Sequence, residues 1–213
     1  MDASKNKVEL IGHYGGDRAH AMSAWTSTTR AREATDEDVA RVIQQMADNG
    51  HGTPFEKSML HFFVTSDIAS HIHLLKHRIG VSINTESARY RELSDNYYIP
   101  EDWPIEERIR LDDLLRHVYR EYHSCMKRLV QKGLSKKRAK ETARFYLPYA
   151  NQVKQDVSFN FRSFLHFYNL RADKHAQREI AFIAEEMLRL IEETGAFDMS
   201  LRAHGLHSTQ ADG

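Results

Sequence analysis

The stretch KHRIGVSINTESARYREL, residues 76–93, decides how this chain is interpreted, because it combines clustered cations with short polar side chains. Its central part, residues 82–91, holds hydroxyl groups, an amide, a carboxylate and arginines, but little that could build a core. Arginine can bind a phosphate through two parallel N–H donors, and a serine hydroxyl can complete the shell of an anion. We therefore predict a binding loop for an anionic ligand over residues 82–91.

Immediately before this stretch, the pattern predicts a strand followed by a helix. Residues 59–65 are aromatic and β-branched, which favours a strand. Ser66 and Asp67 can cap a helix over residues 68–78. On that helix, His73 and His77 are four residues apart and would share one face.

These histidines leave three interpretations open. The segment could be a solvated helix end whose cations complement the helix dipole. His71, His73 and His77 could instead bind zinc, although no HExxH pattern or cysteine pair accompanies them. The third interpretation is an anion or cofactor site, and the polar loop that follows favours it.

A second polar constellation lies near the other end of the chain. Over residues 160–171 an apolar helical stripe is predicted to face the core, while Arg162, His166 and Asn169 fall on a neighbouring face. That polar stripe could simply meet water. Arg171 and the polar residues after it favour a pocket where two helices meet.

Elsewhere helix outweighs strand. Periodic apolar residues predict helices over residues 36–48, 103–133, 135–147 and 176–193, and a short strand over residues 8–11. We expect one domain over residues 1–195, followed by a weakly ordered tail over residues 196–213.

Composition sets further bounds. Thirty basic residues balance thirty acidic ones in the 213-residue chain, so no global field marks a nucleic-acid or membrane binder. Cys125 is the lone cysteine, which excludes an internal disulfide. We find no stretch apolar enough for a membrane span or signal peptide, so we expect the cytoplasm.

The order of several motifs resembles the flavin-dependent thymidylate synthases. The motifs are GHGTPFEKSMLHFFV at 50–64, KHRIGVSINTESARYREL at 76–93, YYIP at 97–100, ETARFYLP at 141–148 and FNFRSFLHFYNLRADKHAQREI at 159–180. Two features depart from the family's pattern of RHR, seven residues and serine. Lys76 replaces the first arginine, and eight residues separate Arg78 from Ser87.

The resemblance implies a fold and an activity. The fold would be α+β: a helix-rich single domain with a small antiparallel sheet, assembled as a homotetramer with sites at the subunit interfaces. The two constellations would then meet across an interface rather than within one protomer. The reaction would be reductive methylation of dUMP to dTMP, with FAD, NADPH and methylenetetrahydrofolate.

The resemblance also implies roles for individual residues. Arg171 would be the leading catalytic residue, with Ser87 activating the nucleotide. The dUMP site would comprise His73, Lys76, Glu86, Ser87, Ala88, Arg89, Arg144 and Arg171. The FAD site would comprise Thr53, Lys76, His77, Arg78, Glu86, Asn160, Arg162 and His166. His51 and Tyr90 would shape access for folate and NADPH.

Two alternatives of other classes stay open. One is a hydrolase with a histidine-bound metal, although we expect none. The other is a nucleotide- or RNA-binding module that uses Arg89, Arg144, Arg162 and Arg171. A thiol mechanism is not expected, because Cys125 lies beside the apolar stripe of a predicted helix, where a buried thiol is inert.

Overall fold

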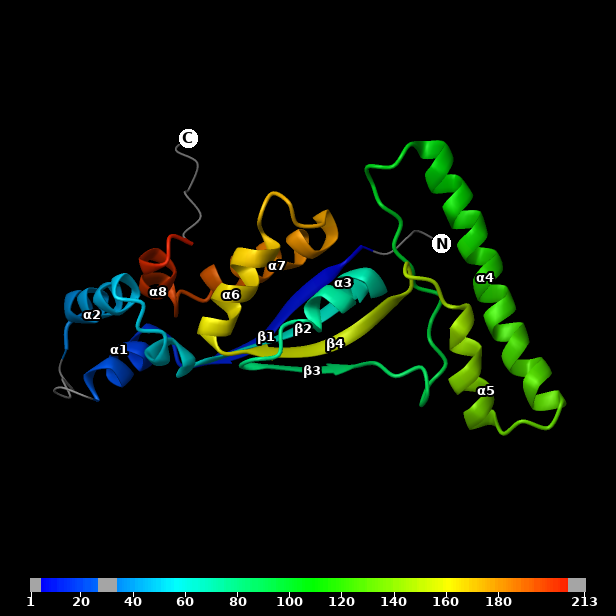
Figure 1. Ribbon diagram of the computed structural model, residues 1–213, viewed down its shortest axis with the longest axis horizontal. Helices are drawn as coiled ribbons and strands as arrows, with labels where there is room; N and C mark the ends of the chain where they lie inside the picture. Colours follow the sequence, from blue (N-terminus) through cyan, green and yellow to red (C-terminus); the bar gives the residue numbers. More distant parts are fainter. Residues whose placement is uncertain (1–4, 27–33, 207–213) are drawn as a thin grey trace. The chain divides into compact units, whose positions relative to one another are not determined.

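The computed structural model describes residues 5–26 and 34–206, which form an α+β fold around one antiparallel sheet (Figure 1). The four strands lie in the order β1-β2-β4-β3. Their bounds are β1 Lys7–Tyr14, β2 Met59–Asp67, β3 Val81–Thr85 and β4 Gln152–Phe159. The fold class expected from the sequence is thus confirmed.

Helices make up most of the remaining structure. They are α1 Asp17–Trp25, α2 Asp36–Asp48, α3 Ile68–Leu74, α4 Ile105–Gln131, α5 Lys136–Ala143, α6 Phe161–Arg171, α7 Arg178–Glu192 and α8 Asp198–Ala203, with 3-10 turns η1 Thr53–Glu56 and η2 Arg144–Tyr146. Among them, α2, α4, α5, α6 and α7 match helices predicted from periodicity. The predicted capping box of α2 is present between Thr35 and Asp38.

The chain divides into two compact units. The first unit comprises Met1–Lys7, Val64–Lys76 and Asn84–Gln155, and the second comprises Val8–Phe63, His77–Ile83 and Asp156–Gly213. Four of the five divisions fall inside strands, and the fifth, between Lys76 and His77, lies between α3 and β3. The single domain over residues 1–195 stays a prediction.

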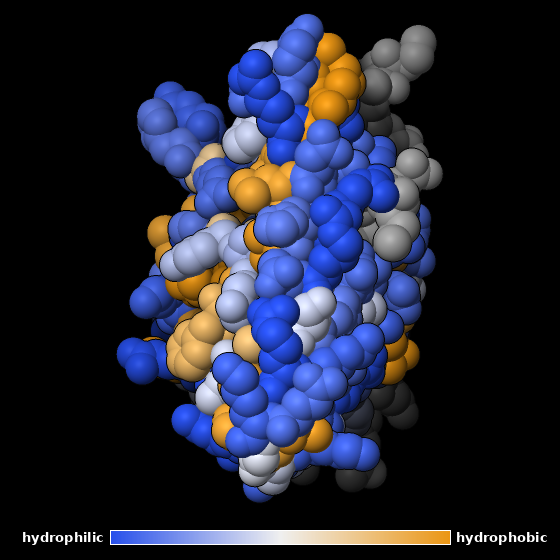
Figure 2. Space-filling view, turned by 90° about the vertical axis from the view of Figure 1, so that its right-hand side faces the viewer, coloured by the Kyte–Doolittle hydropathy of each residue, from blue (hydrophilic) through white to orange (hydrophobic). Residues whose placement is uncertain are grey.

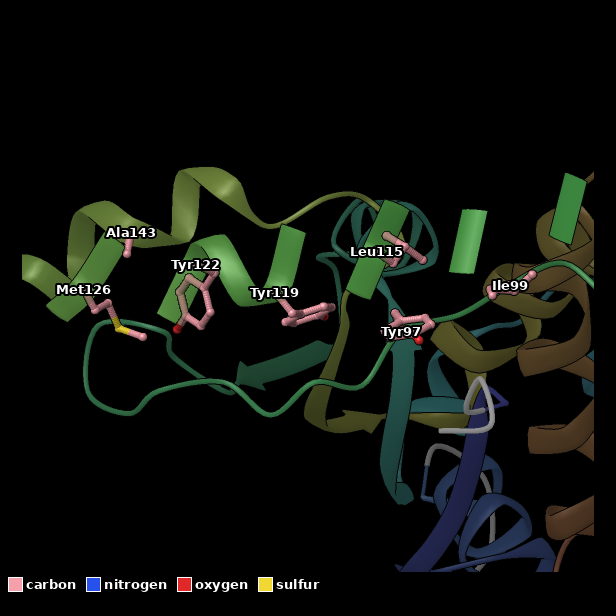
Figure 3. Packing of buried hydrophobic residues seen from close by; sticks show 7 residues of the cluster. All are labelled: Tyr97, Ile99, Leu115, Tyr119, Tyr122, Met126 and Ala143. Carbon is pink, nitrogen blue, oxygen red and sulfur yellow. The ribbon is translucent and has the colours of Figure 1, made fainter. Parts of the chain in front are cut away.

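The core of the first unit is built on one face of α4. Leu115, Tyr119, Tyr122 and Met126 follow each other along this helix at spacings of three and four residues, and all four are buried. Figure 3 shows their side chains on the face of α4 toward Tyr97 and Ala143. Cys125 is partly buried and packs against this cluster, as its position in the sequence indicated.

In the second unit, aromatic rings of β4 and α6 form the core together with the apolar face of α7. The Phe159 ring contacts those of Phe164 and Phe167, and Phe161 stacks on Phe197 with a centroid separation of 5.4 Å. Burial of these rings stabilises this part of the second unit. It also fixes the orientation of α6, whose polar side chains belong to the second predicted constellation.

Four expectations need correction. The helix predicted over residues 68–78 ends at Leu74, so His77 lies beyond it and shares no helix face with His73. Residues 82–85, predicted as loop, belong to strand β3. Strand β4 and helix α1 were not predicted.

The fourth correction concerns the tail. Residues 198–203 form α8, in which Ser200 and Leu201 are buried, so the weakly ordered tail predicted from residue 196 is wrong there. The carboxylate of Asp17 on α1 accepts the backbone N–H groups of Met199 and Ser200 at 2.8 and 2.9 Å, which holds the start of α8 in place. Residues 207–213 of the predicted tail lie outside the described residues.

The surface is mixed in character. Figure 2 shows a face that is mostly hydrophilic, with separate hydrophobic patches. Among the exposed apolar side chains are Ile105, Ile109 and Leu114 of α4, each more than half exposed. Over residues 5–26 and 34–206, no helix combines the length and apolarity needed to cross a membrane.

Candidate functional site

A pocket of about 430 Å³ lies within the first unit. We call it the Ser87 pocket. Its walls come from α3, from the end of β3 with the segment after it, and from the segment between α5 and β4 together with the start of β4. The lining residues are Ile68, His71, Ile72, Thr85, Glu86, Ser87, Ala88, Leu93, Arg144, Leu147, Pro148, Tyr149, Asn151 and Val153. Such a volume with a few convergent polar groups suits a small organic ligand.

The structure brings together four of the residues predicted to bind dUMP. Glu86, Ser87 and Ala88 come from the loop after β3, and Arg144 comes from the turn after α5, yet all four line the same pocket. Arg144 is the first residue of η2 and is exposed. The pocket can therefore offer a hydroxyl and a cation to one ligand.

Contacts with Lys154 of β4 and with Arg91 hold Glu86 in place. Its backbone N–H donates to the carbonyl of Lys154 at 2.8 Å, and its Oε2 accepts the N–H of Lys154 at 3.3 Å. Its Oε1 lies 2.9 Å from Nε of Arg91, and the Glu86 side chain is only 10% exposed. The carboxylate therefore ties the Ser87 segment to β4.

Ser87 begins a tight turn. Its carbonyl accepts the N–H of Tyr90 at 3.1 Å, and its Oγ accepts the N–H of Arg89 at 3.3 Å. The Arg89 guanidinium then pairs with Glu141 of α5 at 3.1 Å. This hydrogen bond holds the pKa of Glu141 below its usual value.

The other residues of the first unit that were predicted to bind the nucleotide do not line the Ser87 pocket. Arg89 is turned toward Glu141, and His73 lies on α3. Lys76 follows the end of α3 and is exposed. Tyr90, expected at the folate entrance, is 74% exposed, with the Arg89 guanidinium 5.9 Å from its ring centroid.

In the second unit, His77 and Arg171 are in direct contact although 94 positions separate them in sequence. Nε of Arg171, at the end of α6, donates to Nε2 of His77 at 3.0 Å. The buried His77 ring also meets His166 and Phe167 edge-on. Burial, with the charge of Arg171 and then His166 adding to it, lowers the pKa of His77 to about 4. His77 is therefore a neutral acceptor that orients Arg171.

The start of α6 is held by the segment after His77. Asn160 caps the helix by accepting the N–H of Ser163 at 2.8 Å, and its own N–H donates to the Gly80 carbonyl at 3.0 Å. Ser163 Oγ donates to the Ile79 carbonyl at 2.7 Å. A Cβ on Gly80 would lie 2.3 Å from both Asn160 Nδ2 and Ser163 Oγ, so only glycine fits here.

Arg162 links α6 to η1. Its Nη1 lies 2.7 Å from Oε1 of Glu56, and a Cβ on Gly52 would lie 2.6 Å from its Nε. Thr53 is the first residue of η1, beside this contact. We call the set His77, Asn160, Arg162, His166 and Arg171 the α6 cluster.

The α6 cluster contains four of the eight residues expected to bind FAD, namely His77, Asn160, Arg162 and His166. Arg78 follows His77 directly and is exposed, as is His51 before Gly52. Two guanidinium groups, a neutral imidazole and a capping amide form a donor set that suits a ligand with phosphates and many acceptors. In chemical type, these residues fit a dinucleotide cofactor.

Residues from the two polar constellations predicted from the sequence come together within the single chain. Arg144 from the later motifs joins Glu86, Ser87 and Ala88 in the Ser87 pocket, and Arg171 contacts His77. The expectation that these residues meet across an interface rather than within one protomer is wrong for both pairs. No group of three potential metal ligands occurs within the part of the chain that the structure describes.

His71 is among the lining residues that the sequence did not assign to the pocket. His71 lines the Ser87 pocket, whereas the sequence suggested only a role in a possible zinc site. The helical pattern could place His71 on α3 but could not show which face of α3 meets the loop after β3. That contact is tertiary.

Comparisons with known proteins identify the family of the chain. The family model described as Thy1, thymidylate synthase complementing protein, matches residues 9–194. A flavin-dependent thymidylate synthase of Thermosipho africanus is 31% identical over 204 residues, which cover 89% of this chain and 87% of that protein. One from Pseudothermotoga lettingae is 33% identical and covers 81% and 79%, respectively.

A solved structure shares the fold. The UMP/dUMP methylase PolB of Streptomyces cacaoi, crystallised with 5-Br dUMP, superposes with a TM-score of 0.82 at 25% identity. The match covers 95% of this chain and 96% of that one. The fold and the matches together define the class of protein as a flavin-dependent methyltransferase of dTMP biosynthesis.

Within that class, the chain belongs to the Thy1 family of flavin-dependent thymidylate synthases. Its matched region contains both the Ser87 pocket and the α6 cluster. Membership in an enzyme family sets aside the non-catalytic binding module.

Proposed function

We propose that this protein converts dUMP to dTMP by reductive methylation, with methylenetetrahydrofolate as one-carbon donor and NADPH as reductant through bound FAD. The observation that carries the proposal is the Ser87 pocket, where Glu86, Ser87, Ala88 and Arg144 converge from distant motifs of the family. The flavin-dependent thymidylate synthases of similar sequence support the same reaction.

In the proposed complex, the nucleotide enters the Ser87 pocket. The Ser87 hydroxyl and the exposed Arg144 guanidinium bind its phosphate, because both can donate hydrogen bonds to an oxyanion. Arg89, His73 and Lys76 complete the anion site from the rim. Glu86 supports the loop through its contacts with β4.

FAD is proposed to bind along the α6 cluster, with Asn160, Arg162, His166, His77, Arg78 and Thr53 as its contacts, together with Lys76 and Glu86. When bound, the flavin supplies the hydride of the reduction. His51 and Tyr90 flank the path of folate and nicotinamide. The sequence identifies no other residues for that path.

Arg171 is the proposed catalytic residue. A fixed positive charge beside the pyrimidine stabilises anionic character in the ring, which makes carbon nucleophilic without covalent attack by a thiol. His77 accepts a hydrogen bond from the Nε–H of Arg171, and its lowered pKa keeps the ring neutral. It therefore orients the guanidinium, which keeps its positive charge. Ser87 assists by binding and activating dUMP.

We further propose a homotetramer in the cytoplasm, with sites completed at subunit interfaces. The exposed apolar residues of α4, Ile105, Ile109 and Leu114, offer surface that assembly would bury. Sedimentation velocity would test the assembly state. A monomeric protein with full activity would contradict the proposal.

The test of function is a defined reaction. Purified protein with FAD, dUMP, methylenetetrahydrofolate and NADPH should form dTMP, detected by chromatography, and should show flavin absorbance that NADPH bleaches under anaerobic conditions. Omission of each component should abolish dTMP. Folded protein that never takes up FAD would overturn the proposed function.

A further inference from the structure

His71 has no role in the site described so far, yet it lines the Ser87 pocket. It lies on α3, opposite the loop that carries Ser87, and its side chain is partly exposed. Its neighbours on α3 in the pocket are Ile68 and Ile72, both apolar. The His71 ring is therefore the one polar side chain that α3 contributes to the pocket lining.

A chain of hydrogen bonds beneath the pocket fixes the orientation of this ring. Ser66 Oγ donates to the carbonyl of Asp67 at 3.2 Å, so it accepts from Nε2 of Gln155 at 2.6 Å. The other end of the Gln155 amide, Oε1, is consequently an acceptor, and it lies 2.8 Å from Nδ1 of His71. Ser66 and Gln155 are fully buried, so water does not compete for these bonds.

The consequence is a defined tautomer. Because Gln155 Oε1 can only accept, Nδ1 of His71 donates to it, and in the tautomer that fits this bond the lone pair lies on Nε2. Among residues 5–26 and 34–206, no side chain or backbone group donates to that Nε2. Asn151, another polar lining residue, already bonds Tyr119 and the Gln152 carbonyl.

We propose that His71 positions the nucleotide by accepting, at Nε2, a hydrogen bond from an O–H or N–H group of its sugar or base. This inference rests on the proposed function of the pocket. The phosphate is not the partner, because a lone pair repels an oxyanion that offers no proton. His71 therefore binds the sugar or base of the nucleotide, while Ser87 and Arg144 bind its phosphate.

Two substitutions separate a ligand contact from a purely structural role. Asparagine can reproduce the donor at Nδ1 but lacks an acceptor at the position of Nε2. Glutamine reaches the Nε2 position but cannot donate to Gln155 in the same geometry. His71→Asn therefore keeps the anchor and loses the pocket acceptor, and His71→Gln does the reverse.

The dissociation constant for dUMP is measured by calorimetry on FAD-loaded protein, with thermal midpoint and flavin absorbance as folding controls. We expect His71→Asn to weaken dUMP binding about fivefold and His71→Gln to stay within about twofold of the unchanged protein. The KM for dUMP should follow the same order, with kcat less affected. The opposite order, or equal affinities, would overturn the role of Nε2.

Ligand analogues give a second measurement that does not depend on how the variants fold. The unchanged protein should bind either 2′,3′-dideoxy-UMP or N3-methyl-dUMP more weakly than dUMP, because each lacks one donor. In His71→Asn that particular loss should disappear. Full affinity for both analogues would refute the inference, whereas no dUMP binding by the unchanged protein would instead refute the proposed function.

Discussion

A hydrogen bond to His77 contributes to the orientation of Arg171. Its Nε donates to the buried, neutral His77, and the His77 ring is held in turn by Phe167 and His166. A guanidinium that is oriented before the substrate arrives costs no reorganisation during the reaction. This arrangement makes Arg171 the residue whose removal should separate catalysis from cofactor binding.

We predict that Arg171→Ala retains FAD but forms dTMP about 100-fold more slowly, in line with the loss of one preorganised donor. Initial rates of dTMP formation and the flavin spectrum of the purified variant measure the two effects. Arg202→Ala, which changes an exposed arginine of α8 in the same unit, serves as the control and should remain fully active. Unchanged turnover in Arg171→Ala would remove the assigned role.

At the scale of elements, the close contact between Gly80 and the start of α6 leaves no room for a side chain. Gly80 has φ of +65°, and its missing Cβ leaves room for the cap formed by Asn160 and Ser163. Any side chain at this position must displace Asn160 and Ser163, which cap the start of α6. The position of the α6 cluster thus depends on a residue that has no side chain.

Gly80→Ala should therefore destabilise the protein by about 2–3 kcal/mol, the sum of left-handed backbone strain and a lost helix cap. Gly50→Ala is the matched control, because Gly50 has nearly the same φ, +67°, but nothing within 4 Å of its Cβ. It should cost about 1 kcal/mol. Urea unfolding measures both, and equal losses would show that the cap contributes nothing.

The position of Cys125 on α4 predicts that the thiol takes no part in the chemistry. Cys125 packs beside the buried stripe of Tyr119, Tyr122 and Met126, within the first unit's core. We expect Cys125→Ser to retain dTMP formation within about twofold, with a modest loss of stability from the hydroxyl in an apolar contact. Complete loss of chemistry in a folded Cys125→Ser protein would support a thiol mechanism instead.

For the chain as a whole, buried neutral histidines should set the acid limit of stability. His20 is 1% exposed, and its ring lies 2.8 Å from Ser58 Oγ and 2.9 Å from Ser200 Oγ. Burial, followed by the charge of His204, lowers the pKa of His20 to about 4, as burial also does for His77. In the unfolded chain, a histidine takes up a proton near pH 6.5.

The unfolded state therefore binds more protons between pH 6.5 and 4, so stability should fall as the pH drops through this window. His20 alone should account for about 3 kcal/mol by pH 4. Burial raises the pKa of Asp17, which acts in the opposite sense, so single variants are compared. Urea midpoints from pH 7.5 to 4.5 should fall less steeply in His20→Gln, and parallel curves would contradict this account.

Local patterns predicted the long elements well. The apolar stripe of α4 repeats at helical spacing over many turns, so its 27 residues were recognisable without any partner. Strand β4 was missed because Gln155 occupies an inward position of its alternation and interrupts the apolar signal. That glutamine is buried because Ser66 and His71 satisfy its amide, which no local pattern reveals.

The sequence by itself determined the family, the chemical types at the site and most helices, because these depend on motif order and on short-range periodicity. The tertiary structure decided which of those residues meet: His77 with Arg171, Arg144 with Ser87, and His71 with a pocket. It also ordered α8, through Asp17 more than 180 positions away. Such contacts arise only when packing brings distant segments together and removes water from between them.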